Sequence, residues 1–195
     1  MELDFRAFAF IITLAAVVNG LGIVRWLTAL AEYLRRKQDI GVDHYWVFNL
    51  AAAFQLLLHV LLWWSLWGIR TTASINFLTY LYLLTGPVLL YLGTSLLVPD
   101  TDGDSVDLRR HYFRVRRAYS TVLILLWLWT VLASPVLRGF FAPTAPFFTL
   151  FLLLAIAQRI TAKPTAHGVS VVLNWALMLV FIGLYAMQLG GAGGA

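Results

Sequence analysis

The amino-acid sequence predicts an all-α integral membrane protein that crosses the bilayer six times, with both termini on the non-cytoplasmic side. Three observations predict this fold: the composition, the spacing of the charged residues, and the uneven distribution of Lys and Arg. Hydrophobic residues make up 61% of the 195-residue chain and charged residues 12%, whereas a soluble domain averages about 25% charged. The composition excludes a soluble enzyme and a disordered chain, and the absence of cysteine excludes a disulfide-stabilised domain.

Six uncharged runs separate the clusters of charged residues, and each run is about as long as a membrane crossing. A helix rises 1.5 Å per residue, so about 20 apolar residues span the hydrocarbon of a bilayer. The expected helices cover residues 6–28, 45–68, 75–98, 118–137, 144–161 and 168–189. No segment alternates apolar and polar residues over about ten positions, as a strand of a membrane barrel does. We therefore expect one transmembrane domain over residues 1–195, with a flexible tail at 190–195.

Lys and Arg residues concentrate on one side of the expected bundle. Ten of the 14 lie in the segments after the first, third and fifth spans, and three lie on the opposite side. Because positively charged loops are retained in the cytoplasm, these three segments are expected to be cytoplasmic. This distribution is what predicts that both termini lie on the other side of the membrane.

Two cytoplasmic segments, 26–37 and 107–119, are expected to be amphipathic helices. In the first, Leu27 and Leu30 lie on one face, away from the charged residues. In the second, Asp107 is placed to cap the helix N-terminus. Basic helices at the interface attract anionic lipid headgroups by about 1 kcal/mol per charge. The simpler alternative is that these charges only determine topology. The arginines expected to contact anionic lipid are Arg109, Arg110, Arg114, Arg116 and Arg117.

An acidic string before the second amphipathic segment partly matches a calcium-binding loop. The carboxylates that could bind the metal are Asp100, Asp102, Asp104 and Asp107. The first three occupy positions 1, 3 and 5 of such a loop. Ser105 replaces the glycine of the turn, and His111 replaces the closing glutamate. Calcium binding and an acidic loop paired with the following arginines are both compatible with the string.

Polar side chains inside the expected spans define a candidate pathway or polar layer, because such groups are costly in lipid. They are Asn19, Asn49, Gln55, His59 and Asn174. Each of the three asparagines is expected roughly 8–10 Å inside the cytoplasmic boundary, counting 1.5 Å per residue from the nearest basic residue or histidine. A shared depth predicts one layer that could hold water, an ion or a small solute. The alternative is that the amides hydrogen-bond between helices and only stabilise packing.

His59 is expected near the middle of the membrane, with Gln55 one turn away on the same face. An imidazole changes charge near neutral pH, so this position is suited to a proton relay or a gate. A neutral histidine that bonds to Thr85 or Tyr82 on the next helix is the structural alternative. Haem is not expected, because a second histidine at the depth of His59 is needed and the sequence offers none.

Two prolines and two tryptophans are also expected inside spans. Pro87 and Pro135 each remove a helical hydrogen bond, so we expect both to bend their helices. Trp127 and Trp129 lie deep in the fourth span, where their indole N–H groups are expected to face protein rather than lipid.

From these residues we predict a channel or transporter for an ion or small polar solute, made pH-sensitive by His59. Six short helices enclose little interior, so a homo-oligomer is expected. Two alternatives remain: a non-catalytic scaffold or accessory subunit of a larger membrane complex, and a calcium- or lipid-responsive sensor. No catalytic motif, thiol or intramembrane carboxylate points to an enzyme, a cofactor or a carboxylate-driven pump. The cations lie along a membrane surface, so nucleic acid is not an expected partner.

The chain resembles small six-span bacterial inner-membrane proteins. The resemblance covers the topology and the region from Pro99–Asp100 to Asp107-Leu-Arg-Arg-His-Tyr112. It implies a location in a bacterial inner membrane and implies no activity.

Overall fold

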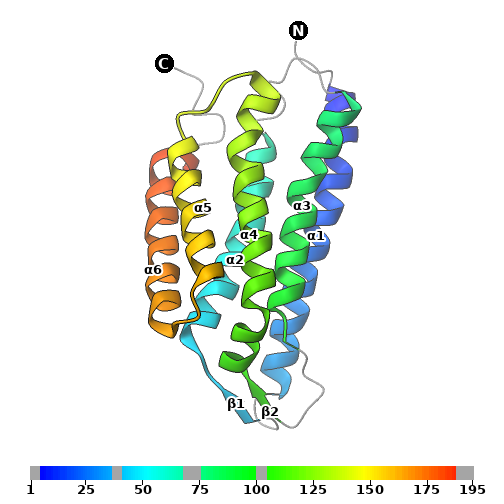
Figure 1. Cartoon of the computed structure of the whole chain (residues 1–195). Helices are drawn as coiled ribbons and strands as arrows, with labels where there is room; N and C mark the ends of the chain where they lie inside the picture. The colour runs from blue at the N-terminus through cyan, green and yellow to red at the C-terminus, as the bar shows by residue number, and fades with distance from the viewer. Residues whose placement is uncertain (1–4, 37–40, 68–75, 100–104, 188–195) are drawn as a thin grey trace.

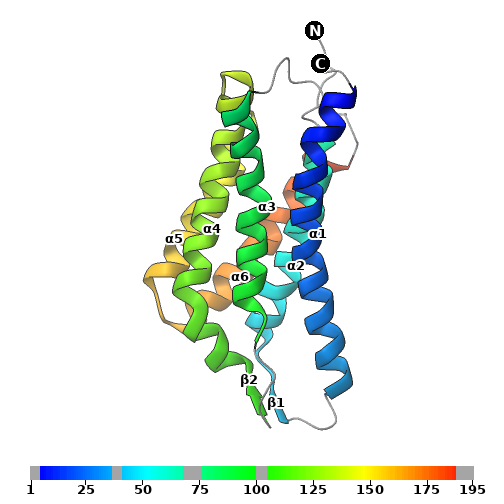
Figure 2. The same cartoon turned by 90° about the vertical axis from the view of Figure 1, so that its right-hand side faces the viewer.

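The computed structural model describes residues 5–36, 41–67, 76–99 and 105–187, which form a bundle of helices that run up and down (Figures 1 and 2). Within these ranges the elements are α1 Phe5–Arg36, β1 Gly41–Asp43, α2 Trp46–Leu66, α3 Phe77–Leu97, β2 Ser105–Asp107, α4 Leu108–Arg138, α5 Ala145–Ile160, α6 Pro164–Phe181 and the π-helical turn η2 Ile182–Ala186. Five of the described helices are long and apolar enough to cross a membrane. The expectation of a helical membrane protein is confirmed at this level.

The expected amphipathic segments are continuous with transmembrane helices. α1 runs through residues 26–36 without a break, and α4 joins residues 108–119 to the span that follows in one 31-residue helix. No glycine or proline interrupts either stretch, so nothing in the backbone ends the helix at the membrane boundary. Asp107 is the N-cap of α4, and its side chain accepts a hydrogen bond from the backbone N–H of Arg110 at 2.8 Å.

The fifth expected span, 144–161, is a helix with nearly the expected bounds, but it is short. α5 has 16 residues and is about 24 Å long, compared with about 30 Å of hydrocarbon. Gly139 ends α4 in a left-handed conformation (φ 80°), and α5 begins at Ala145 with Pro146 in its first turn. Thr161 is extended and ends α5. The structure therefore supports five spans by length, and the sixth stays a prediction, as does the orientation of the bundle.

Two short strands form a feature that the sequence analysis did not predict. β1 and β2 pair in parallel, with Val42 opposite Val106 and Asp43 opposite Asp107. Both strands lead into helices, α2 and α4, that begin at the same end of the bundle (bottom of Figure 1). Three residues are too few for the period-two pattern that identifies a strand. The repeated Val-Asp pair before each helix was the available signal.

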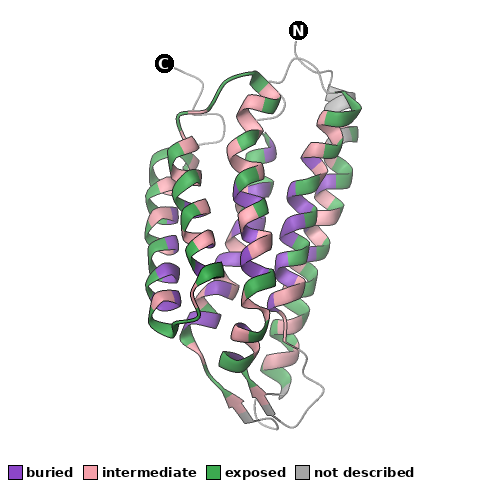
Figure 3. Ribbon diagram, in the orientation of Figure 1, coloured by how far each residue is buried: buried purple, intermediate pink, exposed green. Residues whose placement is uncertain are grey.

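The buried core lies along the centre of the bundle, where α2, α3 and α4 meet (Figure 3). The outward faces of α1 and α6 are rich in exposed apolar side chains, as expected for surfaces in contact with lipid. Trp127 stacks on Phe151 with ring centroids 4.5 Å apart. The indole N–H of Trp129 donates to the carbonyl oxygen of Tyr82 at 2.7 Å. Both tryptophans therefore face protein, as predicted.

Both prolines predicted to bend helices lie inside helices. Pro87 is buried in α3, where it follows Gly86, and Pro135 lies in the last turn of α4. Gly86 is a point of close contact, because a Cβ atom added there would lie 2.5 Å from the indole ring of Trp129. The neighbouring proline and glycine thus allow α3 to approach α4 closely at this level.

Candidate functional site

His59 on α2 joins three helices through hydrogen bonds inside the bundle. Its Nδ1 lies 2.8 Å from Oδ1 of Asn19 on α1, and its Nε2 lies 2.8 Å from Oγ1 of Thr94 on α3. The amide of Asn19 also donates to the backbone carbonyl of His59 at 3.1 Å. Since this bond orients the Asn19 amide, its oxygen accepts from Nδ1–H, and Nε2 accepts from the Thr94 hydroxyl. The arrangement satisfies both nitrogens of a neutral imidazole.

Gln55, one turn from His59 on α2, extends these contacts to α4. Its Nε2 donates to the carbonyl oxygen of Leu90 on α3 at 3.0 Å, and its Oε1 accepts from the Tyr119 hydroxyl at 3.2 Å. All five side chains are at most 3% exposed. We call them the His59 network; its members are Asn19, Gln55, His59, Thr94 and Tyr119.

Two glycines allow the helices to approach at this level. A Cβ atom added to Gly22 of α1 would lie 2.2 Å from Cε1 of His59 and 2.8 Å from its Nε2. A Cβ atom added to Gly93 of α3 would lie 2.8 Å from Nε2 of Gln55. His59 and Gln55 therefore each pack directly on the backbone of a neighbouring helix, as is common where small residues line membrane-helix interfaces.

The structure does not bring the three asparagines into one layer. Only Asn19 contacts His59. Asn49 is exposed and lines an apolar cavity between α1 and α2. Asn174 is buried on α6 and lines a separate cavity of about 10 Å³, together with Gln158 of α5. Among the described residues, the three asparagines therefore do not form one polar layer. Each lies in a different place: at His59, at the larger cavity and at the smaller cavity.

The expected layer fails for two geometric reasons. At about 100° per residue, Asn49 points roughly 80° away from His59 around α2, whereas Gln55 points within about 40° of it. The depth of Asn19 was measured from Arg25, but α1 continues far beyond that residue. Asn19 consequently lies at the level of His59 and not nearer the end of the bundle where α2 and α4 begin.

The partner of His59 on α3 is also different from the one expected. The hydroxyl of Thr85 donates within its own helix at 3.1 Å, and that of Tyr82 donates to the carbonyl oxygen of Trp129. Thr94, which the sequence analysis did not single out, bonds to His59 instead. The signal available for this site was the pair Gly93–Thr94, which combines a small residue with a polar one inside a span.

The arginines of α4 divide into one that contacts the protein and others that face outward. Arg116 Nη1 donates to the carbonyl oxygen of Thr161 at 2.8 Å and to that of Arg159 at 3.3 Å. These carbonyls lie at the C-terminus of α5, where a positive charge is favourable. Of the arginines expected to contact anionic lipid, the exposed ones are Arg109, Arg110, Arg114 and Arg117, and their contact with lipid stays a prediction.

Arg116 is expected to stabilise the end of α5, and a neighbouring arginine provides a control. Arg116→Gln should lower the free energy of unfolding by about 1 kcal/mol, because it removes a charged donor from two carbonyl groups. Arg117→Gln removes the same charge from an exposed side chain and should change stability much less. Unfolding of both variants in mixed detergent micelles measures the difference. Equal effects of the two substitutions would show that Arg116 contributes only charge.

Tyr45, between β1 and α2, is an ionisable group outside the spans with a shifted pKa. Burial raises the pKa of its hydroxyl, and the positive charge of Arg109 opposes the increase. The ring packs against Tyr112 and Phe113, with centroids 5.9 Å and 6.1 Å away. Tyr45 therefore stays neutral at physiological pH and joins β1 to α4 as an aromatic side chain.

The candidate calcium ligands Asp100, Asp102 and Asp104 lie outside the described residues, as does the expected tail at 190–195. The fourth, Asp107, uses its carboxylate to cap α4. Over the described ranges, no three His, Asp or Glu side chains are close enough together to hold a metal ion. Calcium binding stays a prediction from the sequence.

Two of the three other histidines contact the ends of helices. His111 Nε2 lies 3.2 Å from the carbonyl oxygen of Leu97 at the end of α3. His167 is buried at the start of α6, with Nδ1 3.0 Å from the Tyr112 hydroxyl and Nε2 3.0 Å from the carbonyl oxygen of Thr161. These contacts join α3, α4, α5 and α6 near the end of the bundle where α4 begins.

Comparison of the chain with protein-family models, curated proteins and solved structures finds no match. The function must therefore be inferred from the geometry of the described residues.

Proposed function

We propose that the protein is a non-catalytic scaffold or accessory subunit of a membrane complex, with a bundle held in one arrangement by the His59 network. The observation that carries this proposal is that His59 is fully buried and hydrogen-bonded at both ring nitrogens. A side chain that passes protons across a membrane must exchange them with water or with another titratable group, whereas the partners of His59 are an amide and a hydroxyl, which do not titrate near neutral pH. A satisfied imidazole that joins α1, α2 and α3 is better suited to specifying how the helices pack.

The cavities of the described residues also favour a packing role. Neither the larger nor the smaller cavity is lined by Asn19, His59 or Thr94, and Tyr119 is the member of the His59 network that lines the smaller one. Conduction along the pathway first expected, from Asn49 past His59, would require the imidazole to leave at least one of its two partners. The channel or transporter hypothesis is therefore the competing outcome of the experiment below.

The experiment measures ion flux and complex formation on the same preparation. Purified protein in liposomes is expected to give no proton or potassium flux above that of protein-free liposomes between pH 5 and 8. Extraction from its native membrane in a mild detergent is expected to give a particle larger than the 21.9 kDa chain, containing another membrane protein in fixed ratio. A pH-dependent flux that is lost in a folded His59→Leu variant would overturn the proposal and support the channel.

We place the protein in a bacterial inner membrane with the starts of α2 and α4 in the cytoplasm, because the arginines cluster at that end. The chain has no cysteine, so single cysteines can report the orientation. In intact cells with a permeable outer membrane, a membrane-impermeant maleimide is expected to label Phe141→Cys, between α4 and α5, and not Asp43→Cys in β1. Both native side chains are exposed. Labelling of Asp43→Cys alone would reverse the orientation.

A further inference from the structure

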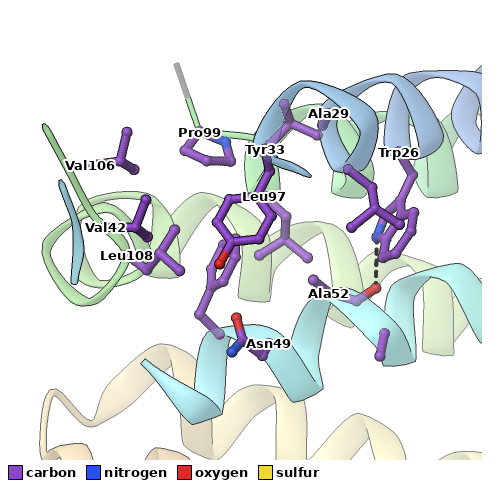
Figure 4. Close-up of a pocket in the computed structure, with 14 residues that line it drawn as sticks. Trp26, Ala29, Tyr33, Val42, Asn49, Ala52, Leu97, Pro99, Val106 and Leu108 are labelled. Carbon is purple, nitrogen blue, oxygen red and sulfur yellow. Dashed lines mark hydrogen bonds between the residues drawn. The ribbon is translucent and has the colours of Figure 1, made fainter. Parts of the chain in front are cut away.

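A cavity of about 320 Å³ lies between α1, α2 and the two strands (Figure 4). Trp26 and Tyr33 line it from α1, and Asn49 lines it from α2. Val42 of β1 and Val106 of β2 lie at the end where the strands pair. The remaining wall is almost entirely apolar, and the volume falls in the range of sites that bind small apolar ligands.

The cavity lies at the level where the membrane interior meets the cationic end of the bundle. The indole N–H of Trp26 donates to the carbonyl oxygen of Ala52 at 2.9 Å. Asn19 and His59 make the corresponding contact between α1 and α2, seven residues away along each helix. Seven residues correspond to about 10 Å along a helix, so the Trp26–Ala52 contact beside the cavity lies about 10 Å from the contact between Asn19 and His59. Indole rings prefer such interfacial positions.

Charged residues of both signs lie next to the cavity wall in sequence at this end, with Asp43 and Asp107 on the strands and arginines at the start of α4. Leu108, the first residue of α4, is part of the wall and is followed directly by Arg109 and Arg110, which are exposed. Within the part of the chain that the structure describes, neither arginine forms an ion pair with a carboxylate. An apolar cavity beside unpaired cations matches an amphiphile with an apolar chain and an anionic headgroup.

We propose that this cavity binds one acyl chain of an anionic membrane phospholipid, with its phosphate against Arg109 and Arg110. Bilayer lipid is the natural source of such a chain, because the cavity opens beside the exposed apolar residues Leu27 and Leu30 of α1. The site is distinct from the His59 network and does not depend on the function proposed above. A lipid bound here would contact α1, α2 and the strand pair together, and so would stabilise the cytoplasmic end of the bundle.

The test is native mass spectrometry of the full chain in detergent with equal amounts of phosphatidylglycerol and phosphatidylcholine. The wild type is expected to retain one phosphatidylglycerol molecule. Ala29→Phe and Ala53→Phe each place a ring in the cavity and are expected to lose it. Ala176→Phe makes the same change at an exposed position of α6 and should retain it. Ala29→Leu fills the cavity with a smaller side chain in case the rings prevent folding.

The headgroup is tested separately from the acyl chain. Arg109→Gln and Arg110→Gln are each expected to reduce the preference for phosphatidylglycerol over phosphatidylcholine about fivefold, with no change in cavity volume. Arg138→Gln, at the opposite end of α4, is the control. The proposal is overturned if folded cavity-filling variants retain phosphatidylglycerol like the wild type. It is equally overturned if the wild type retains none, or if filling the cavity dissociates a dimer, since a second copy of the chain would then be the occupant.

Discussion

Gly22→Ala is expected to lower the free energy of unfolding by about 1–3 kcal/mol, although alanine is the better helix former. The added Cβ atom would lie 2.2 Å from Cε1 of His59, and the ring cannot move aside without losing a hydrogen bond to Asn19 or Thr94. Either α1 must shift away from α2, or the buried imidazole must give up a partner. Thermal and denaturant unfolding in micelles measures the cost.

Gly20→Ala is the matched control, two residues away on the same helix. No atom lies within 4 Å of a Cβ atom added at Gly20, so only the gain in helix propensity remains. We expect this variant to be as stable as the wild type or slightly more so. If the two alanine variants behaved alike, α1 and α2 would not be in contact at His59.

A double substitution identifies the clash as the cause. His59→Ala removes the ring that the new Cβ atom meets, so Gly22→Ala should cost much less in the His59→Ala background than in the wild type. Strict additivity of the two substitutions would assign the loss to the backbone of α1 instead of to contact with the imidazole.

The helices were largely predictable from the sequence because their limits depend on local features. Runs without charge set where a helix is apolar enough for lipid, and Asp107 provides an N-cap that is recognisable before α4. Extension of α1 to Arg36 follows from the lack of any helix-breaking residue after Trp26. The strand pair was missed because its two strands have three residues each and are separated by more than sixty residues of sequence. Local sequence patterns do not show that two such segments pair.

The rotation of the helices was not predictable in the same way, and this is why the candidate site changed. In water, a polar face marks the outside of a helix, but in lipid both the packed and the exposed faces are apolar. Nothing along α2 therefore distinguishes the direction of Asn49, which is exposed, from that of His59, which is fully buried. The partners Thr94 and Tyr119 are common residues in membrane spans, and only their contacts single them out.

Thr94→Val is the corresponding test on α3, and Thr85→Val is its control. Both substitutions replace a hydroxyl by a methyl group in one helix, but Thr94 bonds to His59 whereas Thr85 bonds within α3. We expect Thr94→Val to cost about 0.6–1.7 kcal/mol, the range of hydrogen bonds between membrane helices, and Thr85→Val to cost little. Similar losses for both would mean that Nε2 of His59 gains nothing from its partner.

His59→Leu is expected to be among the most destabilising single changes in the bundle, with a loss of about 1–3 kcal/mol. The leucine fills part of the space of the ring but leaves the Asn19 amide oxygen and the Thr94 hydroxyl buried without their partner. The triple variant Asn19→Leu, His59→Leu, Thr94→Val removes all three polar groups together. Since an apolar replacement of both sides of a buried bond can be nearly neutral, the triple variant should recover much of the lost stability.

The triple variant also separates a packing role from a pathway. If the His59 network only specifies how α1, α2 and α3 pack, the triple variant should fold and still copurify with the partners of the wild type. If His59 carries protons or contacts a solute, the same protein should fold and lose its activity, because an apolar centre has no group that changes charge near neutral pH. The triple variant can thus recover stability while losing activity. The single substitution His59→Leu lowers stability in either case, so it cannot separate the two roles.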